Sequence, residues 1–214
     1  MTEDERRSFI ISERQEQAVS EKRRGVFLQK AYDNGLPICI NCAFHDEMDE
    51  IEGKSLAKQL SFVYNDIKNE RAMVKLILTG IDMQSPLYSY MQLFGVDSWK
   101  VHKHQENYWD IYDVNNVIVL SPDAELFLED IDMDKIYVIG GLVDKHIKRN
   151  ATLTQAKRYG FTTRALPIPT YFPECKRKVL SIDAVFHILV MRANNSTWQE
   201  AFQANIPTRA KIDT

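Results

Sequence analysis

The sequence has only three cysteines and no long apolar run, and both shortages exclude classes of protein. Cys39, Cys42 and Cys175 are too few for a disulfide framework, which favours a reducing compartment. Cys39 and Cys42 form a C-x-x-C pair, but no second Cys/His pair at zinc spacing is present. We therefore expect buried strand cysteines and no metal site. No segment approaches the roughly 18 apolar residues of a transmembrane helix, and the opening residues lack the apolar centre of a signal peptide, so no membrane partner is expected.

Several motifs of nucleotide-binding and hydrolytic enzymes are also missing. No G-x-G-x-x-G follows the first predicted strand, and the P-loop pattern G-x-x-x-x-G-K-[ST] is absent. The patterns G-x-S-x-G and H-E-x-x-H are absent as well. The 214 residues are 44% hydrophobic and 27% charged, which is ordinary for a soluble globular domain.

Apolar periodicity predicts one α/β domain, with a mostly parallel sheet flanked by helices. Residues 1–36 are predicted to form a helical N-terminal extension that Gly35 and Pro37 end, and residues 37–214 the domain itself. Strands are predicted at 37–44, 73–79, 117–120, 135–139 and 161–165. Helices are predicted at 54–69, 84–94, 152–159, 181–191 and after Thr197, and residues 99–112 are expected to be irregular. An acidic helix is predicted after Ser121 and Pro122, because these residues suit an N-cap and a first helical turn.

The most informative stretch is Y-V-I-G-G-L-V-D at 137–144. A β-type run stops at Gly140 and Gly141, and Asp144 follows at the strand's carboxyl end. Open α/β sheets bind ligands at that edge. Two more loops follow predicted strands, L-S-P-D at 120–123 and L-P-I-P at 166–169. Because the carboxyl ends of parallel strands share one edge, we expect the three loops to converge on one crevice.

Charge changes sharply after Asp144. Residues 145–178 contain nine Lys or Arg and one acid, Glu174, whereas the whole chain has a net charge of −3. An acid beside a basic surface suggests polyanion binding next to a reactive centre. The alternative is a βα turn with an Asp N-cap and a solvated basic face. These features alone leave both interpretations open.

Five motifs in order resemble the tRNA purine-9 N1-methyltransferases of the SPOUT superfamily. They are I-V-L-S-P-D-A-E, Y-V-I-G-G-L-V-D, A-L-P-I, R-K-V-L-S-I-D-A-V-F and W-Q-E-A-F-Q-A-N-I-P-T-R. The similarity runs from about Pro37 to Arg209. It implies a SPOUT α/β domain with a C-terminal deep trefoil knot, S-adenosylmethionine as cofactor and tRNA as partner. It also implies a monomer that transfers a methyl group to N1 of the purine at position 9, usually guanine.

The resemblance assigns roles to individual residues. Asp144 matches an acid proposed to accept the N1 proton, and Gln59 matches a glutamine thought to face the target base. The polar side of a helix is the alternative for Gln59. The positions that match the cofactor pocket are Leu120, Ser121, Gly140, Gly141, Val143, Leu166, Pro167, Ile168, Lys178, Val179, Leu180 and Ile182. Those expected to contact tRNA phosphates are Lys145, Lys148, Arg149, Lys157 and Arg158.

The sequence also departs from the family. Asn41 and His45 stand where the family often has Asp, and the usual Lys-rich N-terminal arm is mostly absent. A catalytically weak or inactive tRNA-binding scaffold, such as a subunit of a tRNA-processing complex, is therefore the alternative to an active enzyme. The intact Gly140–Gly141, Asp144 and L-P-I favour the enzyme. The form G-G-L-V-D is closer to the cytosolic and nuclear members than to the mitochondrial subunit, which favours a cytoplasmic or nuclear location.

Aromatic and histidine side chains have a plainer expected role. Trp99, Tyr108 and Trp109 could stack on a flipped base, but packing within the protein is the favoured interpretation. The five histidines lack metal spacing and are expected to be structural or on the surface, with RNA contact as an alternative for His146.

Overall fold

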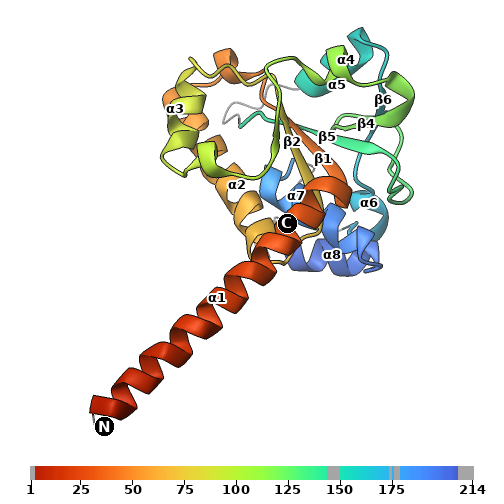
Figure 1. The fold of residues 1–214 in the computed structure, drawn as a ribbon. Helices are drawn as coiled ribbons and strands as arrows, with labels where there is room; N and C mark the ends of the chain where they lie inside the picture. The colour runs from red at the N-terminus through yellow and green to blue at the C-terminus, as the bar shows by residue number, and fades with distance from the viewer. Residues whose placement is uncertain (1–2, 144–149, 174, 176–178, 207–214) are drawn as a thin grey trace.

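A computed structural model describes residues 3–143, 150–173, 175 and 179–206, and its centre is a six-stranded sheet (Figure 1). The strands are β1 (Leu36–Asn41), β2 (Val74–Thr79), β3 (His102–Lys103), β4 (Val117–Leu120), β5 (Ile136–Gly140) and β6 (Thr162–Arg164). Their spatial order is β3-β2-β1-β5-β4-β6, and every pairing between these strands is parallel. At the centre, Asn41 of β1 lies opposite Gly140 of β5. The predicted α/β class is confirmed.

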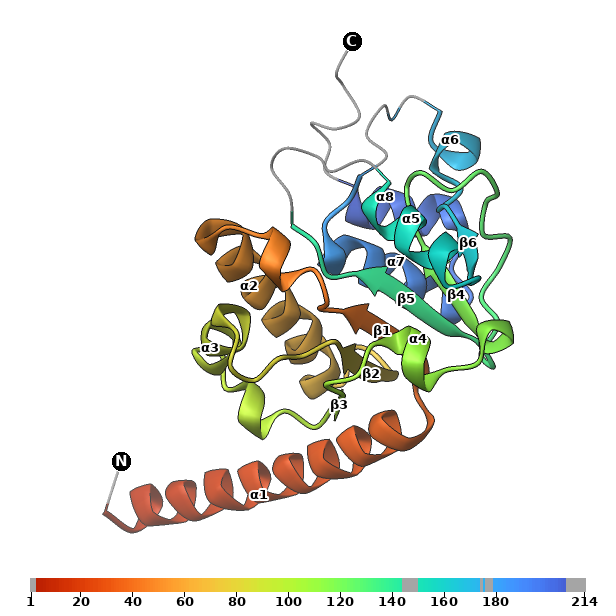
Figure 2. The same ribbon diagram turned by 90° about the horizontal axis from the view of Figure 1, so that it is seen from above.

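Helices cover both faces of the sheet (Figure 2). The helices are α1 (Glu3–Asn34), α2 (Glu50–Lys68), α3 (Pro86–Gln92), α4 (Tyr108–Ile111), α5 (Ala151–Arg158), α6 (Ile168–Tyr171), α7 (Ile182–Ala193) and α8 (Trp198–Asn205). The helices α2, α7 and α8 pack on one face, whereas α4 and α5 pack on the other. The order of elements therefore leaves the carboxyl ends of β4, β5 and β6 at one edge, where their loops meet.

Alternation along the strands divides the core into two layers. Cys39, Val119 and Val138 pack with Tyr108 of α4 and Ala156 of α5. Their neighbours in the strands pack with α2, α7 and α8 on the other side; these are Ile38, Ile40, Leu120, Tyr137 and Ile139. This period of two is what a sheet buried on both faces requires.

The two cysteines of the C-x-x-C pair fall in different layers. Cys39 belongs to the α4–α5 layer and Cys42 to the α2–α7 layer, and both are fully buried. Burial raises the pKa of each thiol to about 12, so both stay protonated at neutral pH. Within the described ranges, no group of three His, Cys, Asp or Glu side chains is placed to hold a metal ion.

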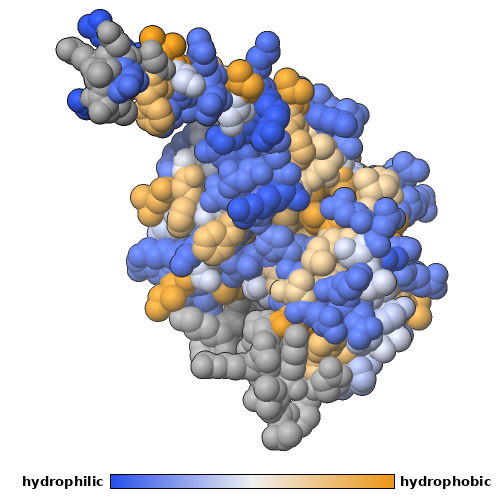
Figure 3. Space-filling model, turned by 90° about the horizontal axis from the view of Figure 1, so that it is seen from below, coloured by the Kyte–Doolittle hydropathy of each residue, from blue (hydrophilic) through white to orange (hydrophobic). Residues whose placement is uncertain are grey.

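The helix α1 projects away from the sheet, and its C-terminal part packs against the rest of the molecule (Figure 1). Hydrophobic and hydrophilic side chains alternate over its surface (Figure 3). The exposed hydrophobic residues include Phe9, Ile10 and Ile11 in one run, and Val19 and Val26 further along. Ala31 is buried, and the Tyr32 ring stacks on His102 with 3.9 Å between centroids. The helix expected from the sequence is confirmed. Across the described residues, no helix combines the length and the apolar content needed to span a membrane.

The acidic helix predicted after Ser121 is wrong, because residues 121–135 contain no helix. The segment is made of turns and bends, and residues 126–128 pair with Ala165 just after β6. Leu126 O accepts a hydrogen bond from Ala165 N at 2.9 Å, and Leu128 N donates to Ala165 O at 2.8 Å. These bonds and the burial of Leu128 outweigh a weak local helix preference. The hydroxyl of Ser121 accepts a hydrogen bond from Asp123 N in a turn instead of capping a helix.

Other boundaries differ by a few residues. β1 ends at Asn41, three residues before the predicted end, and α2 begins at Glu50. Its earlier start follows from a capping box in which Asp49 and Glu52 exchange hydrogen bonds. The stretch 99–112, expected to be irregular, contains β3 and α4, and the L-P-I-P segment leads into α6.

Candidate active site

A cavity of about 700 Å³ lies at the carboxyl ends of β4, β5 and β6. Leu120 and Ser121 contribute the wall that follows β4, and Ile139 and Gly140 the wall at the end of β5. Further walls come from the chain after β6 and from the start of α7. The volume falls within the range of about 300–1,000 Å³ that is typical of small-molecule pockets. The three loops expected to converge do meet here.

The structure places eight of the twelve predicted cofactor residues in the wall of this cavity. They are Leu120, Ser121, Gly140, Leu166, Ile168, Val179, Leu180 and Ile182. Gly141 and Pro167 adjoin lining residues in the sequence without lining the cavity themselves, and Val143 packs against the main core instead. Lys178 lies outside the described residues.

The sequence assigns no cofactor role to the other twelve lining residues, several of which belong to the three loops expected to converge. They are Pro122, Asp123, Ala124, Glu125, Phe127, Leu142, Ala151, Thr152, Ala165, Pro169, Val185 and Ile139. The acids Asp123 and Glu125 could have been found, because Asp123 belongs to the L-S-P-D loop and Glu125 follows it by two residues; the wrong helix prediction assigned both to an acidic helix. No local signal identifies Thr152, because α5 reaches the cavity only through the tertiary fold.

Asp123 and Glu125 give one side of the cavity negative charge. Asp123 Oδ2 accepts a hydrogen bond from Asn150 N at 2.9 Å, which ties the loop after β4 to the N-terminal end of α5. Glu125 Oε1 lies 3.8 Å from Lys157 Nζ, and both side chains are largely exposed. A cationic ligand would therefore find carboxylates at this wall and apolar side chains elsewhere.

The two glycines at the end of β5 exclude side chains by packing. A Cβ on Gly140 would clash with Oγ1 of Thr152. A Cβ on Gly141 would lie 2.5 Å from the main-chain oxygen of Asn41, to which Gly141 N donates at 2.8 Å. Bare backbone therefore faces the cavity at Gly140, as the Gly-Gly pattern predicts.

Asn41 is fully buried at the end of β1 and joins three segments. Its Nδ2 donates to Gln155 Oε1 at 2.7 Å, and its Oδ1 accepts a hydrogen bond from Ala43 N at 3.2 Å. A carboxylate at this position could not donate to Gln155. The departure from Asp at position 41 is therefore accommodated by an amide–amide bond that holds β1 and α5 together behind the Gly-Gly turn.

Gln59 of α2 contacts the cavity wall indirectly. Its Oε1 accepts a hydrogen bond from Ile182 N at 2.8 Å, and its Nε2 donates to Ser55 Oγ at 3.4 Å. Ile182 is the first residue of α7, so this bond satisfies one of the free N–H groups at the helix N-terminus. The side-chain amide of Gln59 thus links α2 to α7. Its role of facing the target base stays a prediction.

Several predicted residues lie outside the described part of the chain: Asp144, Lys145, Lys148 and Arg149. Lys157 and Arg158 are in the last turn of α5, and the Arg158 guanidinium lies 5.6 Å from the centroid of the Tyr159 ring.

The packing role expected for the aromatic residues is confirmed. Trp99 and Tyr108 are buried, and Trp109 stacks on Tyr159 with 4.4 Å between centroids. His102 and His187 make structural contacts, with Tyr32 O and the Asp66 carboxylate respectively.

The strands are parallel and follow this order, and the loops after β4, β5 and β6 form a ligand-sized cavity with a C-terminal helix as its last wall. Together these features define a SPOUT-type α/β fold. The model of one family of that class, tRNA (guanine(9)-N(1))-methyltransferase TRM10/TRM10A, matches residues 2–211. This chain belongs to the TRM10 family.

Relatives and solved structures agree with this assignment. The tRNA methyltransferase 10 homolog B of Bos taurus is 28% identical over 190 residues, covering 85% of this chain and 60% of that protein. The tRNA (guanine(9)-N1)-methyltransferase of Eremothecium gossypii is 31% identical over 179 residues, covering 83% and 60%. The chain thus spans about 60% of the length of these relatives. The crystal structure of full-length spTrm10 with SAH covers 82% of this chain and 98% of that one, with 26% identity and a TM-score of 0.71.

Proposed function

We propose that this protein is an S-adenosylmethionine-dependent methyltransferase that modifies N1 of guanine at position 9 of tRNA. One observation carries the proposal: a TRM10-family chain folds so that its loops after β4, β5 and β6 enclose a cavity of about 700 Å³. The related spTrm10 was crystallised with SAH, the demethylated form of this cofactor.

The residues around the cavity suit such a cofactor. Leu120, Ile139 and Leu180 offer apolar surface for an adenine ring, and the bare backbone at Gly140 allows close approach. The sulfonium and ammonium groups are positively charged, and the carboxylates of Asp123 and Glu125 lie in the same wall.

The chemistry requires a proton acceptor near the base. Bound S-adenosylmethionine supplies an electrophilic methyl group on a sulfonium, a strong leaving group. N1 of guanine carries a hydrogen, so this proton must leave as the N1–C bond forms and the S–C bond breaks. Asp144 is proposed to take the proton. Because a carboxylate is a weak base at neutral pH, positioning would supply much of the rate.

Replacing Asp144 by Asn tests the proton acceptor. The amide keeps the shape of the side chain and cannot accept the proton as a base, so we expect unchanged affinity for S-adenosylhomocysteine and a transfer rate lower by about 10²–10⁴. Single-turnover methyl transfer and calorimetry would measure the two quantities. Full activity in Asp144→Asn at neutral pH would refute the role of Asp144 and leave the family assignment intact.

We also infer that the basic segment after Asp144 binds tRNA. Residues 145–178, with nine basic residues and one acid, would contact phosphates, and Lys157 and Arg158 lie on α5, whose first turn lines the cavity.

We propose a monomer with a trefoil knot at its C-terminal side. The pairing of loop residues 126–128 with Ala165, ahead of α7 and α8, is consistent with such a knot.

The deciding experiment is transfer of labelled methyl from S-adenosylmethionine to unmodified tRNA transcripts that carry G9 or A9, with mapping of the modified base. Label at N1 of G9 is the expected result. Label at N1 of A9 would show that adenine is the target purine and that the proposed reaction is otherwise correct. No label, in protein shown to bind both S-adenosylhomocysteine and tRNA, would favour the inactive scaffold.

A further inference from the structure

The loop between β4 and β5, residues 121–135, builds one wall of the cavity. Its first half, from Ser121 to Phe127, contributes six of the lining residues. Its middle is bonded to Ala165, which lies in the wall that follows β6. Because the loop has no helix or strand of its own, contacts with other segments hold it in place: Asn150 and Ala165 in its first half and middle, and further contacts at its far end.

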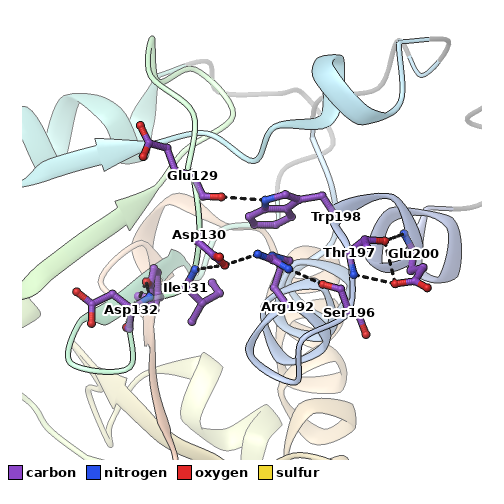
Figure 4. Close-up of polar contacts among 10 residues, drawn as sticks. Glu129, Asp130, Ile131, Asp132, Arg192, Ser196, Thr197, Trp198 and Glu200 are labelled. Carbon is purple, nitrogen blue, oxygen red and sulfur yellow. Dashed lines mark hydrogen bonds and ion pairs between the residues drawn. The ribbon is translucent and has the colours of Figure 1, made fainter.

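Two side chains of the C-terminal helices hold that far end (Figure 4). Trp198, the first residue of α8, donates its Nε1–H to Glu129 O at 3.0 Å. Arg192, in the last turn of α7, forms an ion pair with Asp130 in which Nη2 and Oδ1 are 2.5 Å apart. The Arg192 guanidinium also lies 5.3 Å from the centroid of the Trp198 ring. We call these four residues, Glu129, Asp130, Arg192 and Trp198, the loop clamp.

Several contacts hold the helical side of the loop clamp in place. The Trp198 side chain is 4% exposed and stacks on Phe202, and Arg192 donates a second bond from Nη1 to Ser196 O at 2.6 Å. A capping box between Thr197 and Glu200 fixes the start of α8 and so the place of Trp198. Because Trp198 is buried, its N–H needs an acceptor, which makes the bond to Glu129 O the stronger tie. The ion pair is weaker, because the Asp130 side chain is 64% exposed.

The loop clamp joins two walls of the cavity at their far ends. α7 lines the cavity with Ile182 and Val185 in its first turn and carries Arg192 in its last turn. The loop lines the cavity with its first half and carries Glu129 and Asp130 beyond. We propose that the loop clamp sets the separation of these walls and thereby the affinity for S-adenosylmethionine. Its four residues do not line the cavity, so they are positioning residues. This inference rests on the proposed function.

Two conservative variants test the loop clamp. Trp198→Phe keeps an aromatic ring and removes the donor to Glu129 O together with part of the buried ring system, while Asp130→Asn removes the charge at an exposed position. We expect Trp198→Phe to weaken S-adenosylhomocysteine binding about 3- to 10-fold, and Asp130→Asn about 2- to 3-fold. The affinity for tRNA should stay within about twofold. The matched control is Arg23→Gln, which breaks the 3.2 Å pair with Glu70 at α1, far from the cavity, and should change neither affinity.

Kinetics distinguish positioning from general damage. The KM for S-adenosylmethionine should rise in Trp198→Phe, while kcat at saturating cofactor stays near that of the parent. Hydrogen exchange in residues 121–128 of the free protein should become faster. A lower melting temperature with unchanged cofactor affinity in both variants would overturn the inference and leave the proposed function intact. A parent protein that does not bind S-adenosylhomocysteine at all would overturn both.

Discussion

Gly141 leaves no room for a side chain, because a Cβ there would lie 2.5 Å from the main-chain oxygen of Asn41. The contact is between two backbones, and neither can move without disturbing the β1–β5 pairing. Gly25, in the exposed middle of α1, is the opposite case, because a Cβ there would meet nothing within 4 Å. The same substitution should therefore have opposite effects at the two positions.

We expect Gly141→Ala to lower stability by about 1–3 kcal/mol through overpacking, and to weaken S-adenosylhomocysteine binding because Gly140 lines the cavity next to it. Gly25→Ala should raise helix stability by about 1 kcal/mol without changing that affinity. Urea unfolding and calorimetry measure both effects. Equal stability changes of the same sign would contradict the packing argument.

Two fully buried tyrosines differ in the hydrogen bonds of their hydroxyls. Tyr108 Oη has no hydrogen-bond partner among the residues that the structure describes, whereas Tyr137 Oη accepts a hydrogen bond from Asp132 N at 2.7 Å and donates one to Asp132 O at 3.3 Å. We expect Tyr108→Phe to leave the free energy of unfolding unchanged or to raise it by about 1 kcal/mol. Tyr137→Phe should lower it by about 1–3 kcal/mol, because the Asp132 N–H loses its acceptor. A greater loss at Tyr108 than at Tyr137 in chemical unfolding would show that the Tyr108 hydroxyl has a partner.

Among the elements, α2 and α7 are coupled by Gln59 at the point where α7 enters the cavity wall. Gln59 Oε1 accepts the N–H of Ile182, and Ile182 lines the cavity. A residue that faces a base and a residue that fixes a helix N-terminus require different side-chain chemistry. Substitution can separate the two roles, because the cap needs only an oxygen acceptor.

Gln59→Glu keeps that acceptor and adds a negative charge, which is favourable at a helix N-terminus. We expect it to bind S-adenosylhomocysteine within about twofold of the parent, while Gln59→Leu binds about 3- to 10-fold more weakly because Ile182 N loses its partner. Calorimetry provides the comparison. If both variants retain cofactor affinity and both lose methyl transfer to tRNA, Gln59 acts on the base and not through α7.

Capping signals show how far local sequence can define an element. Thr197 and Glu200 predict the start of α8, and the structure contains that capping box. Ser121 and Pro122 carry a similar signal, yet no helix follows. The difference is tertiary: Leu126 and Leu128 pair with Ala165, which is distant in sequence and carries no signal of its own. Local patterns therefore predict elements whose backbone hydrogen bonds lie within the element. They fail where those hydrogen bonds are made with a segment distant in the sequence.

On the scale of the whole molecule, the sequence predicts where ligands would bind better than it predicts how the site is built. Gly-Gly after an apolar run and two loops after other strands are enough to place the cavity, because parallel strands share one carboxyl edge. Thr152, Gln155 and Val185 reach the site or its support only after α5 and α7 have packed. No spacing in the chain encodes those contacts.

Cys39 and Cys42 are buried in different layers of the core, and this burial makes the free energy of unfolding depend on pH in the alkaline range. Burial raises the pKa of both thiols to about 12, against about 8.5 in an unfolded chain. Above pH 8.5 the unfolded chain releases protons that the folded protein keeps. The free energy of unfolding is therefore at its full value below that pH and falls as pH rises toward 12. Each thiol contributes about 1.4 kcal/mol per pH unit.

We expect urea unfolding between pH 9 and 11 to show this fall, together with a contribution of the same sign from Tyr112, whose pKa burial raises to about 12. The double variant Cys39→Ala/Cys42→Ala should lose roughly 3 kcal/mol per pH unit of the slope, because its two titrating thiols are gone. Val138→Ala, which truncates a neighbour in the Cys39 layer, should lower stability by a similar amount at every pH. Parallel pH profiles for the parent and the double variant would mean that the thiols ionise in the folded protein as readily as in the unfolded chain. Solvent would then reach the core on both faces of the sheet.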